Sequence, residues 1–225
     1  MNLPNAITVG RIELTPLIAW LPFMPSWGSR LAAFVLFLIA AITDYWDGHL
    51  ARQRGLVTDL GSMLDPLADK LLLVATLVPM YLLQRHPAFI SAVEMTAVDG
   101  APFLFVTPFG AVSLPLWMLL VVLGREAFMT LFRQMAARRG LIISAIGPAK
   151  LKTTFQLIWM GAAYFWFFAR TLAIGEGWTE TGWWSAVAQF IGLVGVTSMA
   201  GAVVLTLWSL WLYLRRYGAR VVEAR

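Results

Sequence analysis

The sequence contains no cysteine and only two histidines, so disulfides are excluded and a thiolate zinc site is disfavoured. Charged residues make up only 13% of the 225 residues, far less than in ordinary soluble domains. The first residues lack the basic stretch and the small-residue cleavage site of a secretory signal peptide. The chain also has no internal repeat, low-complexity tract or boundary of a second domain. These absences predict a single domain over residues 1–225.

Hydrophobic residues are abundant, at 60% of the chain, and 11 of the residues are tryptophan. They gather in runs of about 20 residues, the length that an α-helix needs to cross the apolar part of a bilayer. We therefore predict an all-α integral membrane protein with a short interfacial segment over Met1 to Asn5, followed by six transmembrane helices. The predicted spans are Ala6 to Phe23, Leu31 to Leu50, Leu64 to Leu83, Leu114 to Arg138, Thr153 to Ala169 and Trp183 to Leu214.

Positive charge is distributed unevenly between the two predicted faces of the membrane. Six spans put both termini on one side, and ten basic residues fall there against three on the other. The ten are Arg52, Arg54, Arg138, Arg139, Lys150, Lys152, Arg215, Arg216, Arg220 and Arg225, and the three are Arg30, Arg85 and Arg170. The positive-inside rule therefore places both termini in the cytoplasm, in an inner membrane. The net charge of +5 fits anionic lipids and phosphorylated substrates better than nucleic acid.

Four aspartates stand where the second predicted span ends and the third begins. Asp44 and Asp47 are three residues apart and Asp65 and Asp69 are four apart, so each pair shares one face of a helix. Asp65-Pro66 also suits a helix start, because proline is tolerated in the first turn. Four unpaired carboxylates would repel one another, and an all-oxygen set suits a hard divalent cation. Such a cation is commonly completed by phosphate oxygens, which indicates a substrate with a diphosphate.

These aspartates belong to a longer pattern, Asp-x-x-Asp-Gly-x-x-Ala-Arg, then eight residues, then Gly-x-x-x-Asp-x-x-x-Asp. The pattern resembles in full the signature of the CDP-alcohol phosphatidyltransferases, membrane enzymes that exchange the CMP of a CDP-linked lipid for an acceptor alcohol. The resemblance implies that Asp44, Asp47, Asp65 and Asp69 hold two divalent cations, Mg²⁺ or Mn²⁺, and that Asp69 is the general base. It also implies CDP-diacylglycerol as the donor and a homodimer. The remaining signature residues, Gly48, Ala51, Arg52 and Gly61, are expected to bind the CDP-lipid.

A set of basic residues further along the chain indicates the acceptor. Arg125 and Arg133 are eight residues apart, so they share a helix face, and Lys150 and Lys152 follow in a predicted basic loop. Four such cations could bind an acceptor phosphate. The stretches around them resemble those of bacterial phosphatidylglycerophosphate synthases, which implies glycerol 3-phosphate as the acceptor. Because Pro148-Ala149 departs from that pattern, inositol phosphate, serine and phosphatidylglycerol stay open as alternatives.

Other readings of the charged residues also stay open. An intramembrane prenyltransferase would use aspartates and Mg²⁺ but release pyrophosphate, and a cation transporter would move ions without releasing CMP. Arg11, in the first predicted span, is interpreted either as half of an interfacial ion pair with Glu13 or as a functional residue. The connection from Gln84 to Ser113 is interpreted as a hairpin or an irregular loop, with no chemical role.

Overall fold

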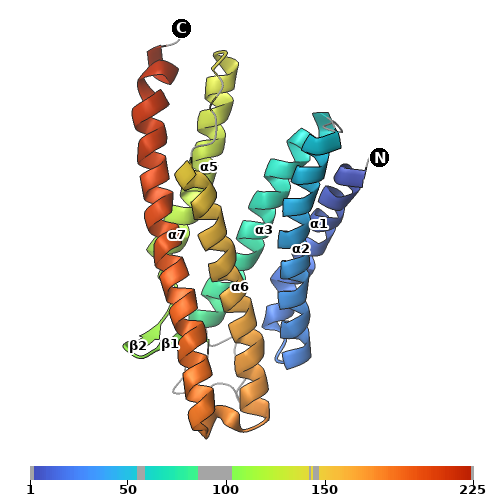
Figure 1. The fold of residues 1–225 in the computed structure, drawn as a ribbon, viewed down its shortest axis with the longest axis vertical. Helices are drawn as coiled ribbons and strands as arrows, with labels where there is room; N and C mark the ends of the chain where they lie inside the picture. Colours follow the sequence, from blue (N-terminus) through green and yellow to red (C-terminus); the bar gives the residue numbers. More distant parts are fainter. Residues whose placement is uncertain (1–2, 55–58, 86–102, 142, 144–146, 224–225) are drawn as a thin grey trace.

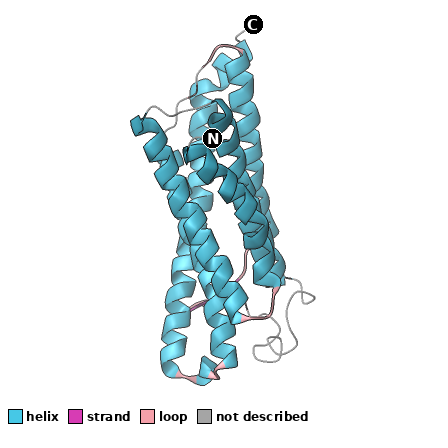
Figure 2. Cartoon of the chain, turned by 90° about the vertical axis from the view of Figure 1, so that its right-hand side faces the viewer, coloured by secondary structure: helices cyan, strands magenta, loops and turns pink. Residues whose placement is uncertain are grey.

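The protein folds into a bundle of long helices. The computed structural model describes residues 3–54, 59–85, 103–141, 143 and 147–223. Within these residues lie six long helices, two 3₁₀ turns and one hairpin of two short strands (Figures 1 and 2). In chain order the elements are α1 (Leu3–Trp20), η1 (Leu21–Phe23), α2 (Trp27–Arg54), α3 (Asp59–Arg85), β1 (Phe105–Thr107), β2 (Gly110–Val112), α5 (Leu116–Arg138), α6 (Gly147–Gly175), η3 (Trp178–Glu180) and α7 (Gly182–Glu223).

The helices form two groups of three, and both termini lie at the same end of the bundle (Figure 1). Helix α1 contacts both α2 and α3 on one side, and α7 contacts α5 and α6 on the other. The groups touch through α2 with α6 and through α3 with both α5 and α6. The ribbons diverge toward the end that holds the termini, while η1, η3 and the hairpin lie toward the opposite end (Figure 1).

The membrane character predicted from composition is confirmed. Among the described residues, five helices are long and apolar enough to cross a bilayer, and the qualifying stretches are Asn5–Phe23, Trp27–Asp44, Leu64–Arg85, Gly147–Gly175 and Gly182–Gly218. The remaining predicted span, Leu114 to Arg138, corresponds to α5, which carries Arg125, Glu126 and Arg133 within its 23 residues. Charged side chains are costly inside a bilayer, so α5 depends on neighbouring helices to cover these three.

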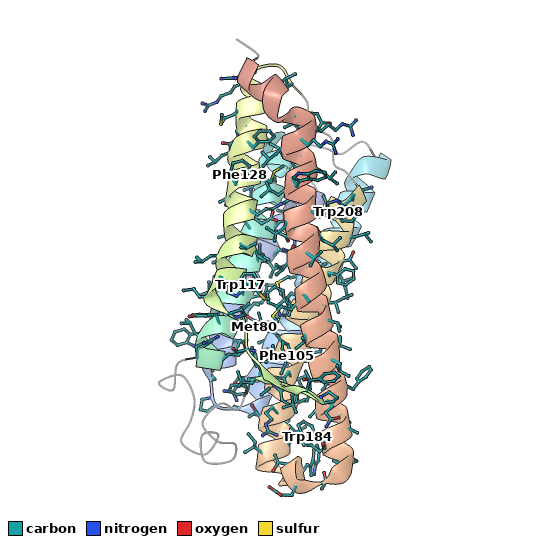
Figure 3. The ribbon with its side chains drawn as sticks, turned by 90° about the vertical axis from the view of Figure 1, so that its left-hand side faces the viewer. Met80, Phe105, Trp117, Phe128, Trp184 and Trp208 are labelled. Carbon is teal, nitrogen blue, oxygen red and sulfur yellow. The ribbon has the colours of Figure 1, made fainter. Side chains whose placement is uncertain are left out.

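Side-chain burial separates a packed interior from an apolar outer surface (Figure 3). Met80, Phe105 and Trp184 are at most 5% exposed, whereas Trp117 and Trp208 are more than half exposed on the outer face. Large exposed apolar side chains are what a lipid-facing surface requires, because lipid tails are as apolar as the side chains themselves. The surface is therefore matched to a bilayer along most of the bundle's length.

Tyr164 on α6 ties three helices together inside this core. Its hydroxyl lies 3.2 Å from the carbonyl oxygen of Ile18 on α1 and 3.0 Å from that of Ala75 on α3. The side chain is fully buried beside Phe37 and Phe167, whose ring centroids lie 5.8 Å from its own. A buried hydroxyl is costly without a partner, so these contacts favour one arrangement of α1, α3 and α6.

Glycines on α7 allow the β-hairpin to pack closely against that helix. A Cβ at Gly192 would overlap with the carbonyl group of Val106, and one at Gly195 would overlap with the ring of Phe105. Small residues at a helix surface permit such close approach. The hairpin interpretation of the long connection is thus confirmed for residues 105–112, where Phe105 pairs with Val112 in antiparallel register; residues 86–102 fall outside the described residues.

Two predicted boundaries near the polar end were wrong. Lys150 and Lys152 lie in the first two turns of α6, which begins at Gly147, and not in a loop. Asp65-Pro66 lies inside α3, which begins at Asp59, and so does not start the helix. In both cases helix extends past the apolar stretch, because polar residues at the membrane surface can continue a helix that the apolar residues have begun.

Candidate active site

Three of the signature aspartates lie together near the end of the bundle that holds the termini. Asp44 is in the second half of α2, and Asp65 and Asp69 are in the first half of α3. Their side chains are 42%, 49% and 58% exposed, respectively, so each carboxylate retains a path to solvent or to a ligand. The predicted sharing of a helix face by Asp65 and Asp69 is consistent with their common contact to one cation, Arg11.

Arg11 on α1 supplies that cation. Its guanidinium forms an ion pair with Asp44, and it lies 3.5 Å from Asp69 and 3.9 Å from Asp65, measured between nitrogen and carboxylate oxygen. One turn earlier on α1, the Thr8 hydroxyl donates a hydrogen bond of 2.8 Å to Asp65. We call Arg11, Asp44, Asp65 and Asp69 the acidic cluster, because three carboxylates surround a single guanidinium.

A second group of charged side chains consists of Arg125, Glu126 and Arg133 on α5 and Lys152 on α6. We call this group the basic wall. The Arg125 guanidinium donates to Glu126 at 3.0 Å and to the Ser209 hydroxyl at 3.1 Å, and Lys152 also pairs with Glu126. Arg125 and Lys152 expose only 5% and 6% of their side chains. Glu126 therefore holds two buried cations in place with one carboxylate.

Arg133 extends the basic wall by two turns of α5. Its guanidinium lies 5.7 Å from the centre of the Tyr213 ring and 3.4 Å from the Tyr213 hydroxyl. This contact leaves the other guanidinium nitrogens of an exposed side chain able to bind an anion.

One cavity of about 480 Å³ joins the acidic cluster to the basic wall. Its charged lining includes Asp44, Asp65 and Asp69 on one side and Arg125, Glu126, Arg133 and Lys152 on the other. Such a cavity can hold a molecule with two anionic ends. One end can bind the carboxylates through cations that lie between them, and the other can bind the basic side chains directly. Carboxylates beside it can also accept a proton from a bound hydroxyl group.

An apolar groove of about 460 Å³ adjoins the cavity and shares Ala41 and Leu157 with it. The groove lies between α2, α6 and α7, and its lining is almost entirely hydrocarbon. Gly161 contributes to the width of the groove, since it places no side chain beside Phe37. A polar cavity and an apolar groove therefore meet at one wall, as an amphipathic ligand would require.

The remaining predicted residues are not all brought to this cavity. Asp47, Gly48, Ala51 and Arg52 lie on α2, but their surroundings fall outside the described residues. Gly61 is buried near the start of α3. Lys150 is exposed and does not belong to the described lining, unlike Lys152 one half-turn further along α6.

Sequence reasoning assigned no role to several residues that hold the site together. Glu126 has no role predicted from the sequence, yet it bridges Arg125 and Lys152, which lies 26 residues further along the chain. Ser209 and Tyr213, on the last helix, were read as part of an apolar span. Their polar groups within an apolar span could have indicated a role inside the bundle, because lipid-facing positions seldom carry polar side chains.

A metal site can be tested only against the described part of the chain. There, no group of three or more histidine, aspartate or glutamate side chains has the arrangement of a metal site. The acidic cluster still fits a hard divalent cation in its chemistry, because three carboxylates with accessible oxygens already converge on a positive charge. The four-aspartate site with two cations therefore stays a prediction.

Comparison with known families decides the class of the protein. The model of the CDP-alcohol phosphatidyltransferase family matches residues 1–208. The chain belongs to this family. Family membership makes it a transferase of phospholipid biosynthesis, and CDP-alcohol phosphatidyltransferases generally depend on divalent cations.

Curated relatives within the family carry more specific names. A CDP-diacylglycerol–glycerol-3-phosphate 3-phosphatidyltransferase of Bacillus subtilis is 34% identical over 173 residues, which cover 72% of this chain and 75% of the relative. A chloroplastic and mitochondrial enzyme of the same name from Arabidopsis thaliana is 31% identical over 220 residues, 96% of this chain but only 62% of the relative's length. A CMP-forming cardiolipin synthase of Streptomyces coelicolor is 26% identical over 208 residues.

Proposed function

We propose that the protein transfers the phosphatidyl group of CDP-diacylglycerol to glycerol 3-phosphate, forming phosphatidylglycerophosphate and CMP. The observation that carries the proposal is the cavity that the acidic cluster and the basic wall share. It offers carboxylates for the metal-bound diphosphate of the donor and cations for the phosphate of the acceptor. The names of the relatives from Bacillus and Arabidopsis support the same pair of substrates.

The acidic cluster would serve the donor. Asp44, Asp65 and Asp69, together with Asp47 from the signature, would hold two divalent cations, Mg²⁺ or Mn²⁺. When bound, these cations would screen the charge of the diphosphate and stabilise the departing CMP. The cytidine and diphosphate would lie against Gly48, Ala51, Arg52 and Gly61, as the signature implies.

Asp69 is proposed as the general base. It is the most exposed of the three described carboxylates, at 58% of its side chain, and it lines the cavity that would hold the acceptor. Asp69 would take the proton of the acceptor hydroxyl as that oxygen attacks the lipid-side phosphorus. The bond from this phosphorus to the CMP oxygen breaks as the new bond forms, so CMP leaves with its own phosphate.

The basic wall would position the acceptor. Arg125, Arg133 and Lys152 line the cavity, and guanidinium and ammonium groups recognise a phosphate well. Glu126 and Ser209 fix the Arg125 guanidinium, which reduces the freedom lost when the acceptor binds. Lys150, although predicted with this set, is exposed and would act at most on the approach of the acceptor.

The apolar groove is proposed to hold an acyl chain of the donor. It adjoins the cavity, because Ala41 and Leu157 line both, so a lipid whose diphosphate lies by Asp44 would have the groove next to its acyl chains. An almost purely apolar lining suits a hydrocarbon chain and no part of the nucleotide.

The topology and assembly complete the proposal. With the active site in the cytoplasm and the helices in the inner membrane, the basic ends of α5 and α7 would face anionic lipid headgroups. Both ends lie at the same end of the bundle as the termini (Figure 1). A homodimer is expected from the family, and cross-linking in native membranes tests it.

The deciding experiment measures CMP release by detergent-purified protein from CDP-diacylglycerol with Mg²⁺ or Mn²⁺. Glycerol 3-phosphate, inositol phosphate, serine and phosphatidylglycerol are supplied one at a time, and mass spectrometry identifies the lipid product. We expect release only with glycerol 3-phosphate. Release with another alcohol and not with glycerol 3-phosphate would reject the acceptor, while pyrophosphate release from a prenyl donor or ion flux without CMP would reject the chemistry.

A further inference from the structure

Arg11 occupies an unusual place for a buried arginine. It is 4% exposed on α1, a helix with the apolar composition of a membrane span, and its guanidinium lies where the carboxylates of Asp44, Asp65 and Asp69 converge. A simple interfacial ion pair with Glu13 would not require contact with carboxylates on two other helices. The contacts cross 33 residues of chain to Asp44 and 58 to Asp69.

We propose that Arg11 is the built-in counter-ion of the acidic cluster and that it weakens the binding of divalent cations when substrate is absent. This inference rests on the metal role of the aspartates in the proposed function. Arg11 is then a positioning residue on α1, outside the aspartate signature. It sets the affinity for the metal and does not itself take part in the reaction.

Charge balance supports this role. When ionised, the three described carboxylates carry three negative charges, and the guanidinium of Arg11 neutralises one of them. A divalent cation bound by the same oxygens must lie close to the guanidinium, so the two positive charges repel each other. Tight metal binding then needs added negative charge, which the diphosphate of the donor supplies.

The structure also keeps Arg11 in place. Its side chain is 5% exposed, and Thr8, one turn earlier on the same face of α1, donates a hydrogen bond to Asp65. Two polar residues of α1 thus fasten this helix to the start of α3. Without a cation the carboxylates would repel one another, so Arg11 is also expected to stabilise the metal-free protein.

The test measures Mn²⁺ binding in the absence of both substrates. Detergent-purified protein, first stripped with EDTA, is titrated with Mn²⁺ while electron paramagnetic resonance reports the free ion. Arg11→Gln removes the charge, and Arg11→Lys keeps a charge on a shorter side chain that cannot span three carboxylates. The matched control is Arg138→Gln, which removes one exposed arginine from the end of α5 and leaves the acidic cluster intact.

We expect Arg11→Gln to bind Mn²⁺ at least about tenfold more tightly than the unmodified protein, and Arg11→Lys a few times more tightly. The midpoint of thermal unfolding in EDTA should fall for Arg11→Gln, and the rise on adding Mn²⁺ should be larger than in the unmodified protein. Arg138→Gln should change neither quantity.

If Arg11 only stabilises the fold, its replacement should not raise the affinity for Mn²⁺. Folded Arg11→Gln that binds Mn²⁺ with equal or lower affinity would overturn the inference. If that variant does not fold, Arg11→Lys decides, and an affinity no higher than that of the unmodified protein would reject the proposal. The absence of measurable Mn²⁺ binding to every variant would also reject the proposal. Because neither substrate is present, these outcomes are independent of which acceptor, if any, supports CMP release.

Discussion

Replacing Arg125 with glutamine tests the assignment of the basic wall to the acceptor phosphate. Arg125 is held by Glu126 at 3.0 Å and Ser209 at 3.1 Å, so its guanidinium is fixed before any ligand binds. Glutamine removes the charge but can keep a polar contact to Ser209. Lys152 remains paired with Glu126, which limits the damage to the rest of the wall.

The expected magnitude follows from the kind of contact that is lost. A hydrogen bond to a charged group contributes about 1.5–3 kcal/mol. At about 1.4 kcal/mol per factor of ten, its loss should lower kcat/KM for glycerol 3-phosphate about 10- to 150-fold. The loss should fall mainly on KM, because the phosphate is bound in the ground state as well as in the transition state.

The assay is CMP release at increasing glycerol 3-phosphate, with CDP-diacylglycerol and metal held constant. Glycerol, which has the hydroxyls but no phosphate, serves as the comparison acceptor, and its slower reaction should be little affected by Arg125→Gln. Arg138→Gln, the same substitution at the exposed end of α5, controls for charge loss in general. Equal losses with both acceptors, or none with glycerol 3-phosphate, would refute the phosphate assignment.

Three further predictions concern other parts of the structure. Asp69→Asn should lower kcat for CMP release about 10²- to 10⁴-fold, the usual contribution of a general base, and activity near that of the unmodified protein would exclude this role. Ala162→Phe should narrow the apolar groove and shift the preference from long to short acyl chains in competition assays; an unchanged preference would place the chain elsewhere. Gly192→Ala should destabilise the protein by about 1–3 kcal/mol through overlap with Val106, seen as a lower unfolding midpoint, whereas Gly175→Ala, with open space around it, should not.

The helices and the aspartates could be predicted because local rules govern both. Apolar runs of membrane length specify spans, and the spacing of Asp65 and Asp69 specifies a shared face. Helix ends were less accurate at Lys150, where basic residues beside an apolar run suit a loop and a helix equally well. Local rules do not predict which side chains from different helices meet. Nothing near Arg11 in the chain indicates that its guanidinium contacts three aspartates from two other helices.

The same limit applies to the basic wall. Arg125 and Arg133 could be paired by their spacing along one helix, and both line the cavity. The bridge from Glu126 to Lys152 joins two helices, and the contact of Arg125 with Ser209 joins a third. Only the packing of α5, α6 and α7 determines which polar side chains meet, and that packing depends on the whole chain.

The acidic cluster and the basic wall belong to different halves of the bundle, and this division has a mechanical consequence. The carboxylates are carried by α2 and α3, whereas Arg125 and Lys152 are carried by α5 and α6. A lateral force that tilts one half against the other would therefore change the separation between the acidic cluster and the basic wall. Bilayer thickness exerts such a force on membrane helices. Turnover is thus expected to depend on bilayer thickness, and CMP release after reconstitution in bilayers of graded thickness measures this dependence.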